Sequence, residues 1–464
     1  MKKKILTDKK YDLESLQNMR IKIDVLRVEN QYLRFELEQL YSELNLFLSV
    51  RYLLKKASKL FWHKCQKKIE RLLKTFINIF FNSNKNENNL EKSFYSENFT
   101  PYKITIINPI QNNRPRILHI IGNFYTGGSS QLIVDLIEHL GHRFEQEVIA
   151  RDLPSKPSYV GLKIHHYEQL NHYHQALDLL NNFRPDFIHL HYLGHHEDDY
   201  SELDWKWYHK FFLAAREYGC KIVENINIPT DPYVSDLVSH YVYVSDYVKQ
   251  EFGHLSDRNI TIYPGSDLKL FSRDNNSELP SDCIGMVYRL EGDKLDENAI
   301  DVFIKVIQRR PRTKALIVGG GYYLELYQNK VQQAGVEEAF TFTGYTSYEN
   351  LPQLYEQISL FVAPVHTESF GQVTPFAMGM GIPVVGYKVG AIPEIVEDCD
   401  LLAPPEDSDA LAEIIIDLLG DRQRQHEIGA KNIQRARQRF SLEAMIDSYG
   451  QIYEQILATL EKTI

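Results

Sequence analysis

The stretch that most constrains the fold lies between residues 360 and 398, where two short apolar runs flank a polar loop and a helix. Residues 360–364 form the first run, which predicts a short buried strand, and residues 382–386 form the second. Between them the loop reaches Gly371, and a helix is expected to begin near Gln372. A glycine-bearing loop that enters a helix offers unpaired backbone amides and the positive end of a helix dipole. The stretch therefore predicts an anion-binding site at the end of a strand.

Four short motifs follow one another in this stretch: Glu368-Ser-Phe-Gly371, Ala377-Met378, Gly381-Ile-Pro-Val-Val385 and Gly390-Ala-Ile-Pro-Glu394. In order and spacing they resemble the donor-site signature of family 4 (group 1) glycosyltransferases of the GT-B fold. The resemblance covers roughly residues 115 to 460 and implies an α/β fold of two Rossmann-like domains, with parallel sheets facing a central cleft. It also implies metal-independent transfer, with retention, of a sugar from a nucleotide-diphosphate sugar to an acceptor hydroxyl. Where the family usually has a second glutamate, this chain has Phe376.

The resemblance gives roles to individual residues. Glu368 is expected to hold hydroxyls of the donor sugar, and Arg289 and Lys294 to grip the diphosphate. Two cations at a strand end can neutralise a pyrophosphate as its charge develops, which supports the second role independently. The alternatives are helix capping by Glu368 and a simple surface pair of Arg289 and Lys294. The other expected donor contacts are Gly127, Gly128, Tyr345, Ser369, Phe370, Gly371, Gln372, Phe376 and Glu394.

The first globular region opens with an apolar strand at residues 116–122, followed by a loop with Gly127 and Gly128 and a helix to about residue 140. The glycine pair lets the backbone approach a ligand. Further strands are expected at residues 147–150, 186–191, 221–223 and 241–244. Strands that alternate with helices in this way predict a parallel sheet covered by helices on both faces.

Polar side chains mark two of these strand ends. The cluster His189, His191, His195 and His196, followed by Asp198 and Asp199, has the residue types of a metal site. The alternative is a polar loop beside a cleft, and the resembled enzymes need no metal, so no metal is predicted. His191 and Asn227 are expected to line the acceptor cleft. Asn227 stands where family members often carry a histidine, and it can donate a hydrogen bond but cannot carry a proton near neutral pH.

The first 114 residues follow other patterns. Apolar residues recur in heptads, with a positions at Leu16, Ile23, Leu37 and Leu44, and only the polar Asn30 interrupts the a positions. A single buried asparagine at an a position favours a parallel coiled-coil homodimer. A basic amphipathic segment follows as far as residue 81, which is typical of a helix lying on an anionic membrane surface. For both segments the alternative is a helix packed on the catalytic domains. Residues 82–114 are polar and predict a linker.

Length and composition complete the domain prediction. A chain of 464 residues exceeds one ordinary core, so we expect domains at residues 115–277 and 278–440 and a C-terminal helix at 441–464 that crosses back to the first domain. A net charge of −10 argues against nucleic acid as a partner. The four scattered cysteines predict free thiols in a reducing compartment. With no secretory signal or spanning segment in the sequence, we expect a cytoplasmic protein that is peripheral on the membrane.

The sequence thus predicts a glycosyltransferase with no cofactor, whose substrates are a nucleotide sugar and a carbohydrate or lipid-linked acceptor. Two alternatives stay open. Because Phe376 replaces the carboxylate that usually receives the ribose hydroxyls, the chain is also compatible with a catalytically degraded scaffold protein. The same fold would also serve a nucleotide-sugar epimerase or hydrolase.

Overall fold

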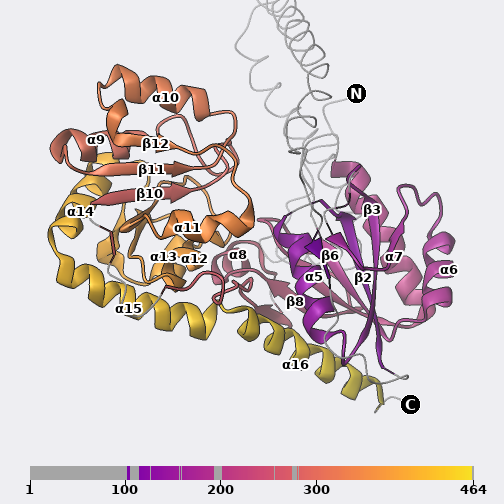
Figure 1. The fold of residues 1–464 in the computed structure, drawn as a ribbon. Helices are drawn as coiled ribbons and strands as arrows, with labels where there is room; N and C mark the ends of the chain where they lie inside the picture. The colour runs from indigo at the N-terminus through magenta and orange to yellow at the C-terminus, as the bar shows by residue number, and fades with distance from the viewer. Residues whose placement is uncertain are drawn as a thin grey trace, which may run out of the picture. The chain divides into compact units, whose positions relative to one another are not determined.

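The computed structural model describes residues 102–104, 114–125, 127–155, 157, 159–192, 201–254, 256–273, 279–280 and 282–461, with backbone only for 102, 201–204 and 461 (Figure 1). The predicted coiled coil and basic helix at residues 1–81, and nearly all of the predicted linker at 82–114, lie outside this set. Within it, β1 spans Tyr102–Lys103. None of the helices described is both long and apolar enough to cross a bilayer. Cys220, Cys283 and Cys399 are free thiols, as the sequence predicts for them.

The first domain is built on a seven-stranded parallel sheet in the order β5-β3-β2-β6-β7-β8-β9. The strands are β2 (Arg116–Asn123), β3 (Glu145–Asp152), β5 (Ile164–His166), β6 (Phe187–Tyr192), β7 (Lys221–Ile226), β8 (Val238–Tyr243) and β9 (Asn259–Thr261), and β4 (Tyr159–Val160) lies outside this sheet. The strand order reverses between β2 and β6. In open parallel sheets ligands bind beyond the carboxyl ends of the strands at such a reversal.

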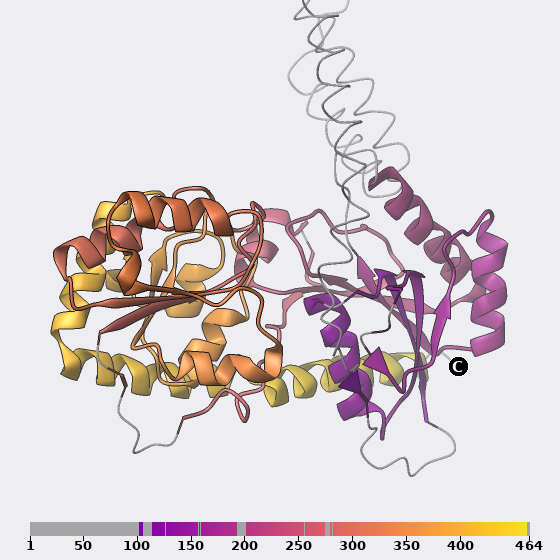
Figure 2. The same ribbon diagram turned by 45° about the horizontal axis from the view of Figure 1, so that its top comes forward.

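Helices cover this sheet on both sides (Figures 1 and 2). They are α5 (Gly128–Leu140), α6 (Tyr173–Phe183), α7 (Ser201–Tyr218) and α8 (Asp246–Phe252). One apolar core joins α5 and the C-terminal helix α16 (Leu442–Glu461) to the sheet residues Ile117, Phe187, Val223 and Val242. The C-terminal helix therefore packs on the first domain, although it follows the second domain in the sequence.

The second domain contains a six-stranded parallel sheet in the order β12-β11-β10-β13-β14-β15. Its strands are β10 (Cys283–Val287), β11 (Lys314–Val318), β12 (Phe340–Phe342), β13 (Leu360–Ala363), β14 (Val384–Tyr387) and β15 (Leu402–Ala403). All four residues of β13 and of β14 are buried, as expected for inner strands that are covered on both faces. Here the strand order reverses between β10 and β13.

The helices of the second domain are α9 (Asp301–Arg309), α10 (Leu324–Gln333), α11 (Leu351–Tyr355), α12 (Val373–Gly379), α13 (Ile392–Val396), α14 (Ser408–Gly420) and α15 (Arg422–Arg439), with short 3₁₀ turns at Glu337–Ala339, Tyr348–Asn350 and Cys399–Leu401. The prediction of two Rossmann-like α/β domains is confirmed. After α15 the chain pairs with Ser266: the Ser266 amide donates to Phe440 O at 2.8 Å, and the Leu442 amide donates to Ser266 O at 3.0 Å. This pairing fixes the start of α16.

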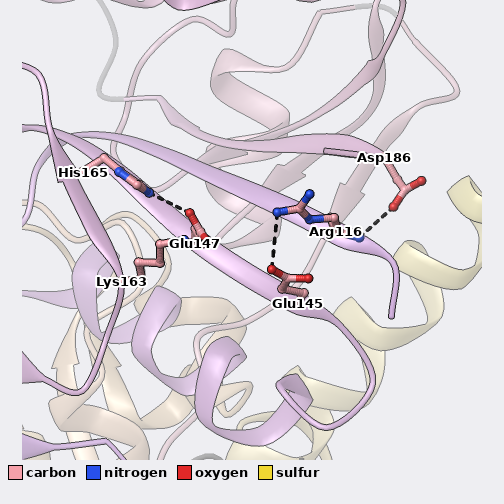
Figure 3. Close-up of polar contacts among 6 residues, drawn as sticks. All are labelled: Arg116, Glu145, Glu147, Lys163, His165 and Asp186. Atoms are coloured by element: carbon pink, nitrogen blue, oxygen red, sulfur yellow. Dashed lines mark hydrogen bonds and ion pairs between the residues drawn. The ribbon is translucent and has the colours of Figure 1, made fainter. Parts of the chain in front are cut away.

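Polar side chains also stabilise the first sheet (Figure 3). Glu147 on β3 is only 4% exposed, and its carboxylate pairs with Lys163 and, at 2.6 Å, with His165 Nε2. At the start of β2 the Arg116 amide donates to Asp186 Oδ2 at 2.7 Å. Burying a carboxylate costs free energy unless it is paired, so the contacts with Lys163 and His165 explain why Glu147 can lie inside the sheet.

Candidate active site

The loops after β10 and β13 meet at the reversal of strand order in the second sheet. Lys294 follows β10, Glu368 follows β13, and the Lys294 ammonium lies 2.6 Å from Glu368 Oε1. A second contact joins the same loops, because the His366 amide donates to Lys294 O at 2.9 Å. The fold thus brings a cation and a carboxylate that are 74 positions apart to the place where parallel sheets bind ligands.

Glu368 is nearly inaccessible, with 1% of its surface exposed. Apart from Lys294, its Oε1 accepts only a long hydrogen bond from the Phe370 amide at 3.4 Å, and Oε2 has no partner among the described residues. A buried carboxylate oxygen without a donor is costly. Helix capping does not explain it, because the one amide of the described residues that donates to this carboxylate is that of Phe370, which precedes α12. A hydroxyl group of a ligand would supply the missing hydrogen bond.

Two glycines hold the backbone close around Glu368. Gly371 has a φ of +77°, and a Cβ there would lie 2.6 Å from Glu368 Oε2. Gly390 has a φ of +51°, and a Cβ there would overlap the carbonyl oxygen of Glu368, which already accepts from the Ala391 amide at 2.9 Å. Both positions require a left-handed backbone and leave no space for a side chain, which explains why glycine stands at each.

The two predicted phosphate cations differ in their surroundings. Lys294 is held by Glu368, whereas Arg289 is 66% exposed and pairs with Asp293 at 2.7 Å, four residues along the chain. An exposed ion pair of this kind contributes little to stability. The Arg289 guanidinium can therefore turn to an incoming anion without breaking the protein interior.

The residues between Glu368 and α12 contact the segment that follows β9 and the end of α15. The Phe370 ring is 3% exposed and packs against Tyr263 and Phe440, each with ring centroids 5.6 Å away. The side-chain amide of Gln372 donates to Gly265 O at 3.0 Å. Ser369 between them is half-buried. Of this predicted set, Phe370 and Gln372 direct their side chains to the protein, so only their backbone could serve a donor.

Phe376 occupies an aromatic cluster. Its ring stacks on Phe271 with centroids 4.0 Å apart and an interplanar angle of 7°, Tyr348 contacts it edge-on, and only 5% of the residue is exposed. Phe376 is among the expected donor contacts, but Phe271 already covers the face of its ring, so the ring is not open to a ribose or base. The physical reason is that burying a phenyl ring against other aromatic rings lowers the free energy more than placing it against a polar ligand would.

Glu394 was predicted to contact the donor, and the structure places it at the N-terminus of α8. Its Oε2 accepts from the Tyr247 amide at 3.2 Å, while Oε1 has no partner among the described residues. Burial, and secondarily the charge of Asp246, raise the pKa of Glu394 to about 7. The carboxyl group thus links α13 to the end of the first domain, and its charge changes near neutral pH.

The glycine loop of the first domain and Tyr345 of the second are both accessible. Gly127 and Gly128 are exposed, and a Cβ at either would meet no atom within 4 Å. Tyr345 is 56% exposed, and its ring lies against Gly320 after β11. These three residues are therefore open to a ligand.

The two predicted acceptor residues behave differently. Asn227 lies just after β7, is half-buried, and donates to Ser129 Oγ at 2.8 Å, so it lies beside the glycine loop. His191 is 0% exposed. The prediction that His191 lines the acceptor cleft is therefore wrong: its β6 position points into the core face of the sheet, against His119 and His189.

These three histidines form a buried row on β2 and β6, with ring nitrogens within 4.8 Å of one another. Hydrogen bonds satisfy several of the ring nitrogens in this row. Gln146 donates to Leu136 O at 3.0 Å, so its Oε1 accepts from His119 Nε2 at 2.9 Å, and His119 Nδ1 lies 3.2 Å from His191 Nε2. Burial lowers the pKa of His119 to about 4, so the ring is neutral. His195, His196, Asp198 and Asp199 of the predicted cluster lie outside the described residues.

Sequence reasoning gave no role to His119 or Asn225. His119 lies in the middle of β2, in register with His189, and two strands of one sheet with histidines at matching positions would have indicated the pair. Asn225 lies two residues before Asn227 and on the same strand face, and its side-chain N–H donates to Asn227 Oδ1. No sequence signal indicated its other partner, the hydroxyl of Tyr449 in α16.

Comparison with known proteins shows which proteins this part of the chain resembles. The sequence model of the glycosyl transferases group 1 family matches residues 269–435, which include Lys294, Glu368 and Glu394. This segment therefore resembles a group 1 glycosyltransferase domain, and the two parallel sheets have the GT-B fold of similar solved structures. Among solved structures, Anabaena Alr3699/HepE in complex with UDP is similar with a TM-score of 0.61 and 19% identity, over 73% of this chain and 100% of that one.

Two curated relatives resemble parts of the chain. The lipopolysaccharide core biosynthesis mannosyltransferase LpsB of Rhizobium meliloti is 29% identical over 184 residues, 38% of this chain and 51% of that protein. The D-inositol 3-phosphate glycosyltransferase of Corynebacterium efficiens is 26% identical over 264 residues, 52% of this chain and 59% of that protein. The chain thus spans about half the length of the curated relatives it matches.

Proposed function

We propose that this protein is a retaining, metal-independent glycosyltransferase. It transfers a sugar from a nucleotide-diphosphate sugar to an acceptor hydroxyl. The observation that carries the proposal is the buried Glu368 carboxylate, which lies 2.6 Å from Lys294 and keeps one oxygen without a partner among the described residues, inside a group 1 domain. A mannosyltransferase and an inositol-phosphate glycosyltransferase among the similar proteins, and UDP bound to the similar Anabaena protein, support the class of donor.

In this mechanism the ammonium of Lys294 neutralises the diphosphate as negative charge develops on it, and the Arg289 guanidinium adds a second cation. The Glu368 carboxylate accepts hydrogen bonds from the donor-sugar hydroxyls and fixes the sugar relative to the acceptor. The bond from the anomeric carbon to the diphosphate oxygen breaks, and the acceptor oxygen bonds to the same face and passes its proton to the departing diphosphate, so the configuration at the anomeric carbon is retained. The cations take the part that a metal ion plays in other transferases.

The ribose of the donor needs a different partner from the family's second glutamate, because Phe376 is buried against Phe271. This observation also favours a second candidate, a scaffold protein that has lost donor binding. Calorimetry with UDP, GDP and ADP separates the two. The transferase binds one of these diphosphates, and Lys294→Met weakens that binding by about 10-fold or more, the loss expected for a charge-assisted hydrogen bond. A scaffold binds none of them.

The acceptor we propose is a growing cell-surface polysaccharide or a glycolipid. The name of LpsB, a lipopolysaccharide core enzyme, supports it, as does the basic amphipathic pattern before residue 82, which lies outside the described residues. Such a pattern binds anionic lipid, so removal of residues 1–82 should abolish co-sedimentation with liposomes that contain anionic lipid. Unchanged sedimentation would refute the membrane part of the proposal. Turnover of donor without any acceptor would instead indicate a hydrolase or epimerase.

A further inference from the structure

A chain of hydrogen bonds runs from the C-terminal helix α16 to the glycine loop of the first domain. The Tyr449 hydroxyl donates to Asn225 Oδ1, the Asn225 amide donates to Asn227 Oδ1, and the Asn227 amide donates to Ser129 Oγ at 2.8 Å. Ser129 is the second residue of α5, directly after the exposed Gly127 and Gly128. The four side chains, which we call the relay, therefore connect α16 to the residues beside the glycine pair.

The relay has one direction. Tyr449 is 1% exposed, and burial raises its pKa, so the hydroxyl keeps its proton and serves as the first donor. Each asparagine then accepts through its oxygen and donates through its nitrogen. Hydrogen bonds aligned head to tail polarise one another, and Asn225 is fully buried, so this arrangement fixes the orientation of both amides.

At the end of the relay, Ser129 Oγ uses a lone pair to accept from Asn227. Its hydroxyl hydrogen consequently points away from Asn227 and is available to donate. Ser129 is half-buried beside the exposed glycine pair, at the N-terminal turn of α5. A donor fixed at that place suits an oxygen atom of a sugar or phosphate substrate.

We propose that Tyr449, Asn225 and Asn227 are positioning residues that aim the Ser129 hydroxyl at a substrate oxygen bound on the glycine loop. The proposal rests on the proposed transferase function and assigns that function its contacts in the first domain. Through the relay, α16 determines the geometry of the glycine loop as well as the packing of the first domain.

The helix provides a matched control. Tyr453 lies one turn after Tyr449, is 0% exposed, and packs in the same apolar core. Its hydroxyl contacts His189 Nδ1 at 2.6 Å instead of Asn225. Tyr449→Phe and Tyr453→Phe therefore each remove one buried hydroxyl from α16, but only the first removes a member of the relay.

Hydrogen–deuterium exchange on the full chain tests the geometry without any substrate. The Gln131 amide donates to Gly127 O at 2.9 Å and reports on the first turn of α5. We expect Tyr449→Phe to speed exchange of the Gln131 amide by roughly 10-fold, the effect of losing about one hydrogen bond. Tyr453→Phe leaves this amide at the wild-type rate. Equal exchange in both variants overturns the relay.

Kinetics then separate positioning from simple stabilisation. With the donor and acceptor that product analysis identifies, Tyr449→Phe should raise one substrate KM by roughly 10-fold and leave kcat within about twofold, because the lost contact holds bound substrate. Tyr453→Phe keeps the wild-type KM. If both variants lose thermal stability and neither changes KM, the relay is only structural. Hydrogen–deuterium exchange needs no substrate, so it tests whether the relay holds the glycine loop even if no sugar transfer is detected.

Discussion

The ion pair between Lys294 and Glu368 makes a quantitative prediction for Lys294→Met. This change removes the ammonium that lies 2.6 Å from a carboxylate with 1% exposure and leaves that carboxylate with one amide contact at 3.4 Å. Loss of one partner of a fully buried pair costs about 3–5 kcal/mol. Because the Lys294 side chain is 36% exposed, solvent reduces the effect, and we expect about 2 kcal/mol.

The assay is thermal unfolding at neutral pH followed by a double-mutant cycle. For a domain of this size, about 2 kcal/mol corresponds to a decrease in Tm of about 4–8 °C. Adding Glu368→Gln to Lys294→Met removes the unpaired charge, so the double variant should regain most of the loss. Transfer stays low in the double variant, because both proposed donor contacts are absent.

Arg289→Met is the matched control for stability. Arg289 lies on the same loop, but its pair with Asp293 is exposed on both sides, 66% and 45%, so its removal should change stability by less than about 0.5 kcal/mol. A decrease in Tm that is equal for Arg289→Met and Lys294→Met would refute the burial argument. So would a double variant that is no more stable than Lys294→Met alone.

Three further changes test the surroundings of the site. Gly390→Ala should lower the free energy of unfolding by more than about 2 kcal/mol in urea titration, because the new methyl overlaps Glu368 O at a positive φ; a wild-type midpoint would contradict this. Phe376→Ala should cost about 3–5 kcal/mol through loss of the stack on Phe271, and a change below about 1 kcal/mol would show that the ring is not buried there. The pKa of Glu394 is raised to about 7, so between about pH 4.5 and 7 the native protein keeps a proton that the unfolded chain releases. The Tm of the wild type minus the Tm of Glu394→Gln should therefore fall over this pH range and stay level above it. A difference that does not change with pH would contradict the assignment.

The strands of the fold were largely predictable because their signal is local. The apolar run at residues 116–122 corresponds to β2, and the run at 360–364 corresponds to β13, each within one residue at its ends. The helix expected near Gln372 begins at Val373. Such features depend on side-chain periodicity and backbone sterics within a few residues.

The partners of the site residues were not predictable in the same way. Lys294 and Glu368 were each assigned to the donor, but their direct ion pair depends on the strand order that brings β10 beside β13. His191 was expected in a cleft and lies in the core, because a strand end does not by itself tell which face is covered. The contact of Tyr449 with Asn225 joins positions 224 residues apart, and nothing in one sequence encodes such a pair.

The most direct test of the account is mass spectrometry of products from a panel of nucleotide sugars, each incubated with the full chain and an extract of lipid-linked and polysaccharide acceptors. The wild-type protein should add one hexose mass to one acceptor from one donor, with the anomeric configuration of the donor retained. Glu368→Gln should reduce this product by about 100-fold or more, because the donor sugar loses the carboxylate that orients it. Wild-type product formation by Glu368→Gln would contradict the proposed site, and the absence of any product and of any bound nucleoside diphosphate would contradict the transferase itself.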